Sequence, residues 1–262
     1  MNTLPAGQAY ESNPWVLCLA PRPFAGLRLF CFPHAGAGPL AYREWFRLMP
    51  SEIEVCGVRL PGRECRITEP PLRDLSTMVQ RLAEGLAPRL GQRFALFGHS
   101  MGAIVAFELA HFLRSHGGPQ PAHLFVSGHR APHLPRQHEE LSNLDDSTLL
   151  EELRKLGGSP EAALNHAELM DLLLPMLRAD FAVCETYAYV PRHPLHCPIT
   201  ALGGLQDPYV DREQLEAWRQ HTQGDFSVRM FAGDHFFPIA HPARVTQVLV
   251  QRMISHLIHA PT

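Results

Sequence analysis

The stretch that decides the fold is Phe94-Ala95-Leu96-Phe97-Gly98-His99-Ser100-Met101-Gly102-Ala103-Ile104. An apolar run ends at Gly98, a helical pattern begins after Gly102, and Ser100 stands at the turn between them. The pattern G-x-S-x-G suits such a turn, because small neighbours leave room for a serine held in strained backbone geometry. We therefore interpret Ser100 as a nucleophile, the alternative being a tight turn with an incidental serine. The amide of Met101, at the start of the helix, is expected to stabilise negative charge.

The same alternation of apolar run, turn and helical pattern recurs along the chain. Six apolar runs are predicted to be strands: 27–32, 54–58, 94–97, 124–126, 199–202 and 226–231. Helical patterns fall at about 74–90, 101–116, 211–220 and 241–258. Short apolar runs alternating with helices predict an α/β fold, with a mostly parallel central sheet and helices on both faces. We expect residues 1–262 to form a single domain.

The segment from about 137 to 186 breaks this alternation and contains only helical patterns. Asp146 is expected to cap one helix, Ser159-Pro160 to begin a second, and Pro175 to break or restart the pattern. An all-helical insertion after a strand, inside an α/β frame, predicts a lid over 137–186. The alternative is that these helices form a wall of the core.

A serine nucleophile needs a base that is held by an acid. Asp207 follows the run 199–202 and His235 follows the run 226–231, which matches the Ser, acid, His order of the α/β-hydrolase fold. We predict that Asp207 orients His235, and that His235 takes the serine proton and later returns it. Asp211 and Asp234 are the competing acids. The competing bases, His241 and His256, lie in a helical pattern.

The first apolar run leads into the loop Pro33-His34-Ala35-Gly36-Ala37-Gly38. Small residues allow backbone amides to approach a substrate carbonyl. We predict that the amides of Ala35 and Met101 form the oxyanion hole. An ordinary glycine turn is the alternative.

Composition excludes several classes of protein. Of the 262 residues, 45% are hydrophobic and 19% are charged, which is typical of a globular protein. The 23 basic and 26 acidic residues give a net charge of −3. This charge argues against nucleic acid as a partner. The chain has no apolar run long enough to cross a membrane, and Met1-Asn2-Thr3-Leu4-Pro5 lacks the pattern of a secretory signal, so a cytoplasmic protein is expected.

Cysteines and histidines do not show metal-ligand spacing. The cysteines form no CxxC pair and are expected to be reduced thiols, with a disulfide framework or zinc site as the alternative: Cys18, Cys31, Cys56, Cys65, Cys184 and Cys197. Four clustered histidines also match no ligand pair and are interpreted as ordinary polar residues: His123, His129, His133 and His138. No metal or cofactor site is predicted.

Five motifs together resemble a known family. They are Phe32-Pro33-His34-Ala35-Gly36, Leu60-Pro61-Gly62-Arg63-Glu64, Gly98-His99-Ser100-Met101-Gly102-Ala103, Leu177-Arg178-Ala179-Asp180-Phe181 and Gly233-Asp234-His235-Phe236. Over nearly its whole length the chain resembles the stand-alone type II thioesterases of nonribosomal-peptide and polyketide pathways. One departure is the first loop, which reads Ala-Gly-Ala-Gly where many relatives carry a double glycine followed by Ser or Ala.

The resemblance implies an α/β-hydrolase fold with a helical lid. It also implies hydrolysis of acyl thioesters on the phosphopantetheine arm of carrier proteins, which are the expected partners, to clear misprimed or stalled acyl groups. Candidates for binding the substrate are His34 and Phe236, together with apolar residues of the lid pattern: Leu172, Leu173, Leu174, Met176, Leu177 and Phe181. Apolar residues at helical spacing are also typical of a core.

An arginine group could meet an acidic carrier surface or the phosphate of the arm: Arg59, Arg63, Arg66 and Arg73. Interleaved Glu64, Glu69 and Asp74 allow a solvated mixed-charge face instead. Three rival functions stay open: a product-releasing thioesterase or cyclase, a lipase or carboxylesterase, and a catalytically silent binding protein. A silent binding protein would be expected to lack one of the three predicted catalytic residues, Ser100, Asp207 and His235.

Overall fold

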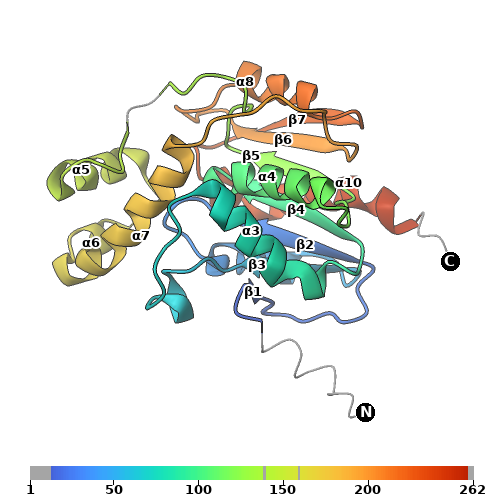
Figure 1. Ribbon diagram of the computed structural model, residues 1–262, viewed down its shortest axis with the longest axis horizontal. Coiled ribbons are helices and arrows are strands. Elements are labelled where there is room, and N and C mark those ends of the chain that lie inside the picture. Colours follow the sequence, from blue (N-terminus) through green and yellow to red (C-terminus); the bar gives the residue numbers. More distant parts are fainter. Residues whose placement is uncertain (1–12, 138–139, 159, 259–262) are drawn as a thin grey trace, which may run out of the picture.

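A computed structural model describes residues 13–137, 140–158 and 160–258 (Figure 1), and side chains through residue 254. Its centre is a seven-stranded sheet in the order β1-β3-β2-β4-β5-β6-β7. All neighbouring strands run parallel except β1 and β3. The mostly parallel α/β fold predicted from the sequence is therefore confirmed.

The six predicted strands are present, most of them slightly longer than their apolar runs: β2 Leu27–Phe32, β3 Ile53–Val58, β4 Phe94–His99, β5 Leu124–Ser127, β6 Ile199–Gly204 and β7 Phe226–Phe231. The sequence did not predict β1, Val16–Leu17, because two residues give no periodic signal. In the parallel register His99 lies opposite Ser127, and Ser127 lies opposite Leu202. The carboxyl ends of the strands thus meet at one edge of the sheet, where the site residues follow.

Apolar side chains pack on both faces of the sheet. In β2, Phe30 and Phe32 belong to a core with α3 (Leu75–Leu86) and α4 (Met101–Ser115). Their neighbours Leu29 and Cys31 belong to a second core with α2 (Trp45–Leu48) and α10 (Pro242–Ile258). Burial on both faces explains why the strand sequences are continuous apolar runs.

Shorter helices complete the frame. The predicted helix 211–220 is a short α-helix followed by a 3₁₀ turn: α8 (Arg212–Glu216) and Ala217–His221. The others are α9 (Phe237–Ala240) and the 3₁₀ helices Pro39–Tyr42, Glu64–Arg66 and Ala87–Arg89.

Between β5 and β6 the described residues contain three helices and no strand of the sheet, and the helices stand to one side of the sheet in Figure 1: α5 (Asp146–Leu156), α6 (Glu161–Leu164) and α7 (Ala167–Glu185). They share a small apolar core of their own, to which Leu149, Leu153 and Leu174 belong. The long helix α7 lies against α4 and so connects this lid to the frame.

Three details of the lid differ from the sequence prediction. Asp145, not Asp146, caps α5, because its Oδ1 accepts the amide of Thr148 at 3.0 Å. Pro160 precedes α6 as its N-cap instead of occupying the first helical position, and Ser159 lies outside the described residues. Helix α7 continues through Pro175, since Leu174 and Met176 on either side are held in the lid core.

None of the helices in the described ranges combines the length and the apolar character that a membrane crossing requires. Residues 1–5, on which the expectation about a secretory signal rests, lie outside the described residues, as does His138.

Candidate active site

Ser100 stands between β4 and α4 in a backbone conformation that side chains rarely adopt, with φ 53° and ψ −118°. Such strain persists only where the surroundings impose it. The surroundings here are close: a Cβ on Gly98 would lie 2.0 Å from the carbonyl oxygen of Gly102. A Cβ on Gly102 would lie 2.2 Å from the carbonyl oxygen of Phe32. A side chain at either glycine of the motif would therefore clash with the backbone, as the sequence predicted.

Asp207 and His235 come from the loops after β6 and β7 and meet above the sheet edge. Nδ1 of His235 lies 2.8 Å from Oδ2 of Asp207, whose side chain is fully buried. The amide of Tyr209 donates to the other carboxylate oxygen at 2.9 Å and fixes its orientation. Because Nδ1 is engaged by the acid, Nε2 is the ring nitrogen left for proton exchange.

The hydroxyl of Ser100 forms no hydrogen bond with His235 among the described residues. Both side chains instead line the same two cavities. A serine and its base often draw together only when substrate is bound. The structure thus brings Asp207 into contact with His235 and places Ser100 on the shared cavity walls.

The competing acids have structural partners elsewhere. Asp211 caps α8 by accepting the amide of Gln214 at 2.8 Å, within a reciprocal capping box. Asp234 accepts the amide of Phe236 at 2.9 Å. His241 ends α9, and the side chain of His256 lies outside the described residues. Among the three acids considered, Asp207 is the one that contacts His235, as the sequence predicted.

Loop 33–38, which carries Ala35, approaches the amino end of α4, where Met101 is the first residue. Among the described residues neither amide donates a hydrogen bond to another protein group. A first-turn helix amide has no partner within its own helix. Both predicted oxyanion donors thus remain available, and Ala35 shares the cavity walls with Ser100.

A buried ion pair holds this loop to the lid. Asp180 on α7 accepts the amide of Gly36 at 2.8 Å and both guanidinium nitrogens of Arg63, at 2.7 and 3.0 Å. Arg63 also donates to the carbonyl of Ala37 at 2.7 Å. The side chains of Arg63 and Asp180 are 4% and 0% exposed, so the pair cannot exchange these bonds for water. The neighbours of Ala35 are therefore fixed on one side by the lid helix.

Two further histidines surround the base. Partial burial, with the neighbouring charges of His235 and Arg63, lowers the pKa of His34 to about 4. Burial also lowers the pKa of His99 well below its usual value, and its Nδ1 lies 3.0 Å from the hydroxyl of Ser127. Both rings are neutral near pH 7, and they place no second positive charge beside His235 when it takes up a proton.

The first cavity, of about 440 Å³, lies under the lid and is mainly apolar. Six of the eight side chains predicted to bind substrate line it: His34, Leu173, Met176, Leu177, Phe181 and Phe236. Two other candidates do not. Leu172 is 55% exposed, and Leu174 packs into the lid core, because they point away from the cavity on the same helix.

A second cavity, of about 460 Å³, shares Ser100 and His235 with the first. Its wall includes charged and polar side chains from the loop after β5 and from the lid: Arg130, Arg136, Gln137, Thr148, Glu152 and Glu185. Phe181, Leu156 and Ala35 line both cavities and stand between them. Ser100 and His235 therefore lie where an apolar and a more polar chamber meet.

The Thioesterase domain family matches residues 27–255. The chain belongs to the thioesterase family. It is 48% identical to the gramicidin S biosynthesis protein GrsT of Aneurinibacillus migulanus, over 87% of this chain and 89% of that one. The type II thioesterase BorB from the borrelidin biosynthetic cluster superposes with a TM-score of 0.85 at 37% identity, covering 93% of this chain and 99% of the other. RedJ, from the prodiginine pathway of Streptomyces coelicolor, gives a TM-score of 0.79 at 44% identity, covering 89% of each chain.

Three of the four arginines predicted to meet a carrier are paired with acidic side chains in this thioesterase, and the fourth, Arg73, is exposed. Arg63 is buried against Asp180, Arg59 pairs with Glu64 at 3.2 Å, and Arg66 pairs with Glu69 at 2.6 Å. The guanidinium of Arg66 also lies 4.0 Å from the ring of Trp15. The mixed-charge interpretation fits these partners better than a docking surface for an acidic carrier.

No pattern in the sequence predicted the contacts that hold loop 33–38 of this thioesterase, or its second cavity. Arg63 and Asp180 were quoted in motifs, but nothing in the sequence paired two residues separated by 117 positions. The clustered histidines serve packing: His123 bonds to Thr200 at 2.9 Å and His133 to His221 at 2.8 Å. The one group of three possible metal ligands in the described ranges is Cys18, Glu54 and Cys56.

Proposed function

We propose that this thioesterase hydrolyses acyl thioesters on the phosphopantetheine arm of carrier proteins, and so removes misprimed or stalled acyl groups from a nonribosomal-peptide or polyketide assembly line. The relatives support this: GrsT is named for gramicidin S biosynthesis, BorB is a type II thioesterase of the borrelidin cluster, and RedJ belongs to the prodiginine pathway. The observation that carries the proposal is that two chambers meet at Ser100 and His235.

A carrier-bound thioester extends in two directions from its carbonyl carbon. The acyl group is apolar and suits the chamber lined by Leu173, Met176 and Leu177, where each buried methylene contributes about 0.8 kcal/mol. The pantetheine arm carries amides and a phosphate and suits the chamber lined by Arg130, Arg136 and Gln137. In this orientation the thioester carbonyl lies beside Ser100.

The reaction proceeds through an acyl-enzyme. His235 takes the proton of Ser100 as the serine oxygen attacks the carbonyl, while Asp207 holds the ring and stabilises its positive charge. The oxyanion accepts hydrogen bonds from the amides of Ala35 and Met101. The carbon–sulfur bond then breaks, and the sulfur leaves as a thiol with the proton from His235. Water repeats the attack on the ester, which releases the carboxylic acid and restores Ser100.

Every step of this mechanism uses protein groups and water, so we propose that the enzyme needs no cofactor and no metal. Chelator treatment should leave turnover unchanged. The proposal also places the enzyme in the cytoplasm, together with its carrier proteins. Most free thiols in the chain, including those of Cys31 and Cys56, are at least partly buried and suit a reducing compartment.

One parallel assay tests the proposal. Acetyl-carrier, aminoacyl-carrier, acyl-coenzyme A and a simple oxygen ester are compared at equal concentration, with Ser100→Ala as the control. We expect the carrier thioesters to have the highest kcat/KM and Ser100→Ala to lose on the order of 10⁶-fold in kcat while keeping its fold. Faster cleavage of the oxygen ester would favour a carboxylesterase. Preference for a full-length peptidyl thioester with cyclic product would favour a product-releasing enzyme. Carrier binding without turnover would favour a silent binding protein.

A further inference from the structure

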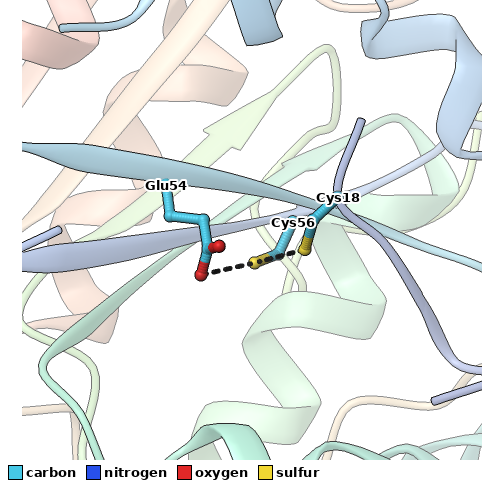
Figure 2. Close-up of side chains that lie close together, drawn as sticks. All are labelled: Cys18, Glu54 and Cys56. Carbon is cyan, nitrogen blue, oxygen red and sulfur yellow. Dashed lines mark hydrogen bonds between the residues drawn. The ribbon is translucent and has the colours of Figure 1, made fainter. Parts of the chain in front are cut away.

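Cys18 and Cys56 face each other at the edge of the sheet formed by β1, although they are 38 positions apart in the sequence. Strands β1 and β3 pair antiparallel, with Val16 opposite Val58 and Leu17 opposite Gly57. Continuing that register by one residue places Cys18 opposite Cys56. Their Sγ atoms lie 3.3 Å apart. Figure 2 shows the two thiols pointing toward one another.

The backbone register favours a covalent link at this position. The amide of Arg59 donates to the carbonyl of Trp15 at 2.8 Å, which makes that facing pair a hydrogen-bonded one. Hydrogen-bonded and non-hydrogen-bonded pairs alternate along an antiparallel ladder, so Cys18 and Cys56 fall at a non-hydrogen-bonded pair. The Cα atoms of such pairs are about 4.5 Å apart, within the range of about 4.4–6.8 Å that disulfides span. The sulfurs can approach to about 2.05 Å with little movement of the strands.

The two thiols differ in access and in acidity. Cys18 is partly exposed, whereas Cys56 is fully buried. A hydrogen bond from Cys56 lowers the pKa of Cys18, while burial and the charge of Glu54 raise it. The charges of Arg89 and Arg28 also lower it, and the net direction is downward. Burial raises the pKa of Cys56. Cys18 is thus the thiol that an oxidant reaches and that ionises first, with Cys56 behind it.

We propose that Cys18 and Cys56 form a dithiol that oxidises reversibly to a disulfide joining β1 to β3. The oxidant is a small disulfide such as oxidised glutathione. The Cys18 thiolate attacks one sulfur of that reagent and expels a thiolate, which leaves a mixed disulfide on Cys18. Cys56 then loses its proton and attacks Sγ of Cys18, which expels the second thiol. The protein gives up two electrons and two protons, and the reagent becomes two thiols.

Bound metal is a less suitable interpretation of the same cluster. Glu54 contributes its carboxylate beside the thiols, but Oε2 already accepts Nε of Arg28 at 2.8 Å and Oε1 accepts the amide of Arg22 at 2.9 Å. A guanidinium nitrogen of Arg89 also lies 3.8 Å from Sγ of Cys18. A divalent cation here would lack a fourth ligand among the described residues and would lie among positive charges.

The expected effect is on the amino-terminal segment rather than on turnover. Cys18 precedes the residues 27–255 that match the family, so the link attaches a segment outside that core to the sheet. Strand β2 separates β3 from β4 and from Ser100. We therefore expect oxidation to raise Tm and to slow proteolysis near residue 18, with kcat unchanged.

The experiment incubates the full chain in glutathione buffers of graded potential, blocks the remaining thiols, and maps the peptides by mass spectrometry. We expect a Cys18–Cys56 linked peptide, lighter by two hydrogen atoms, that dithiothreitol abolishes. Cys18→Ser and Cys56→Ser should each prevent it, and Cys184→Ser, which alters another partly buried thiol, should not.

Several outcomes would overturn the proposal. One is an unlinked Cys18 in wild-type protein under conditions that glutathionylate the exposed Cys65. Another is a stable mixed disulfide on Cys18 that never resolves. A third is stoichiometric zinc in the purified protein that Cys18→Ser releases. Because the peptide map is read on wild-type protein, the test does not depend on the folding of any variant.

Discussion

Arg63 and Asp180 form a buried, two-point ion pair, with nitrogen–oxygen distances of 2.7 and 3.0 Å, that joins the loop after β3 to the lid helix α7. The same carboxylate accepts the amide of Gly36, next to the predicted oxyanion donor Ala35. We therefore expect Asp180 to be a positioning residue, which holds loop 33–38 without touching substrate.

Asp180→Asn should destabilise the protein by about 3–5 kcal/mol, because it leaves the Arg63 charge buried and unpaired. It should also lower kcat by roughly 10- to 100-fold with a smaller change in KM, since the oxyanion amide is displaced rather than removed. Urea unfolding and steady-state kinetics at a temperature where the variant is folded measure the two effects.

The matched control for Asp180 is Asp146→Asn. Asp146 is another lid carboxylate paired with an arginine, Arg178, but it is 67% exposed. Exposed pairs contribute about 0–1 kcal/mol, so this variant should resemble wild type in both measurements. A wild-type kcat for folded Asp180→Asn would remove the positioning role.

Asp207→Asn should lower kcat by about 10⁴-fold, the magnitude for the corresponding change in a serine protease, because the amide favours the wrong tautomer of His235. The controls are Asp211→Asn and Asp234→Asn. Asp211 caps α8, so its loss should cost about 1 kcal/mol of stability at most and leave kcat unchanged. If Asp211→Asn lost the activity instead, the acid would have to be reassigned.

The preference of the enzyme for acyl groups of a given length should depend on Leu173. Leu173→Trp fills part of the apolar cavity and should lower kcat/KM for long acyl-carriers at least 10-fold while acetyl-carrier turnover persists. Leu172→Trp is the control on the adjacent position, because Leu172 points to solvent. Equal effects of both variants on a series of acyl lengths would contradict the placement of the acyl group.

Stability should fall as the pH is lowered from about 6.5 toward 4, because buried histidines take up protons only on unfolding. Burial, with the charges of Arg192 and Arg114, lowers the pKa of His111 to about 3. The unfolded chain binds that proton below about pH 6.5, so the stabilisation is complete above this pH and is lost as the pH falls toward the folded pKa.

The measurement is the free energy of unfolding in urea at several pH values. In His111→Asn, the free energy of unfolding should change less steeply with pH between about pH 4 and 6. The slope should be shallower by up to about 1.4 kcal/mol per pH unit, the value for one proton. An unchanged slope would show that His111 does not bind the extra proton.

Local sequence patterns were enough to predict the fold and to select the candidate triad. Strands buried on both faces leave continuous apolar runs, and the loop positions of Ser100, Asp207 and His235 follow from the order of strands in a parallel sheet. Strand β1 was missed because two residues have no period, and Asp145 rather than Asp146 caps α5 because adjacent carboxylates look alike in sequence. Local propensity also failed at Pro175, where packing of the lid core sustains the helix.

Pairings across the chain were not predictable in the same way. Arg63 stands among interleaved charges that favour a solvated surface, and only the fold brings it to Asp180. The contact between Cys18 and Cys56 was not predictable either, because it depends on the register of the edge strand β1, for which the sequence has no periodic signal. A single sequence encodes periodicity and turns directly, whereas long-range partners emerge from the tertiary structure.

Asp180 and Phe181 are consecutive residues of α7, yet one secures the oxyanion loop and the other divides the two chambers. On the proposed function, we expect an oversized acyl group that pushes the Phe181 ring outward to displace the neighbouring Asp180 carboxylate as well. Such a substrate would then be disfavoured by loss of transition-state stabilisation as well as by lack of room. Substrate size and catalytic competence would thereby be coupled within a single turn of helix.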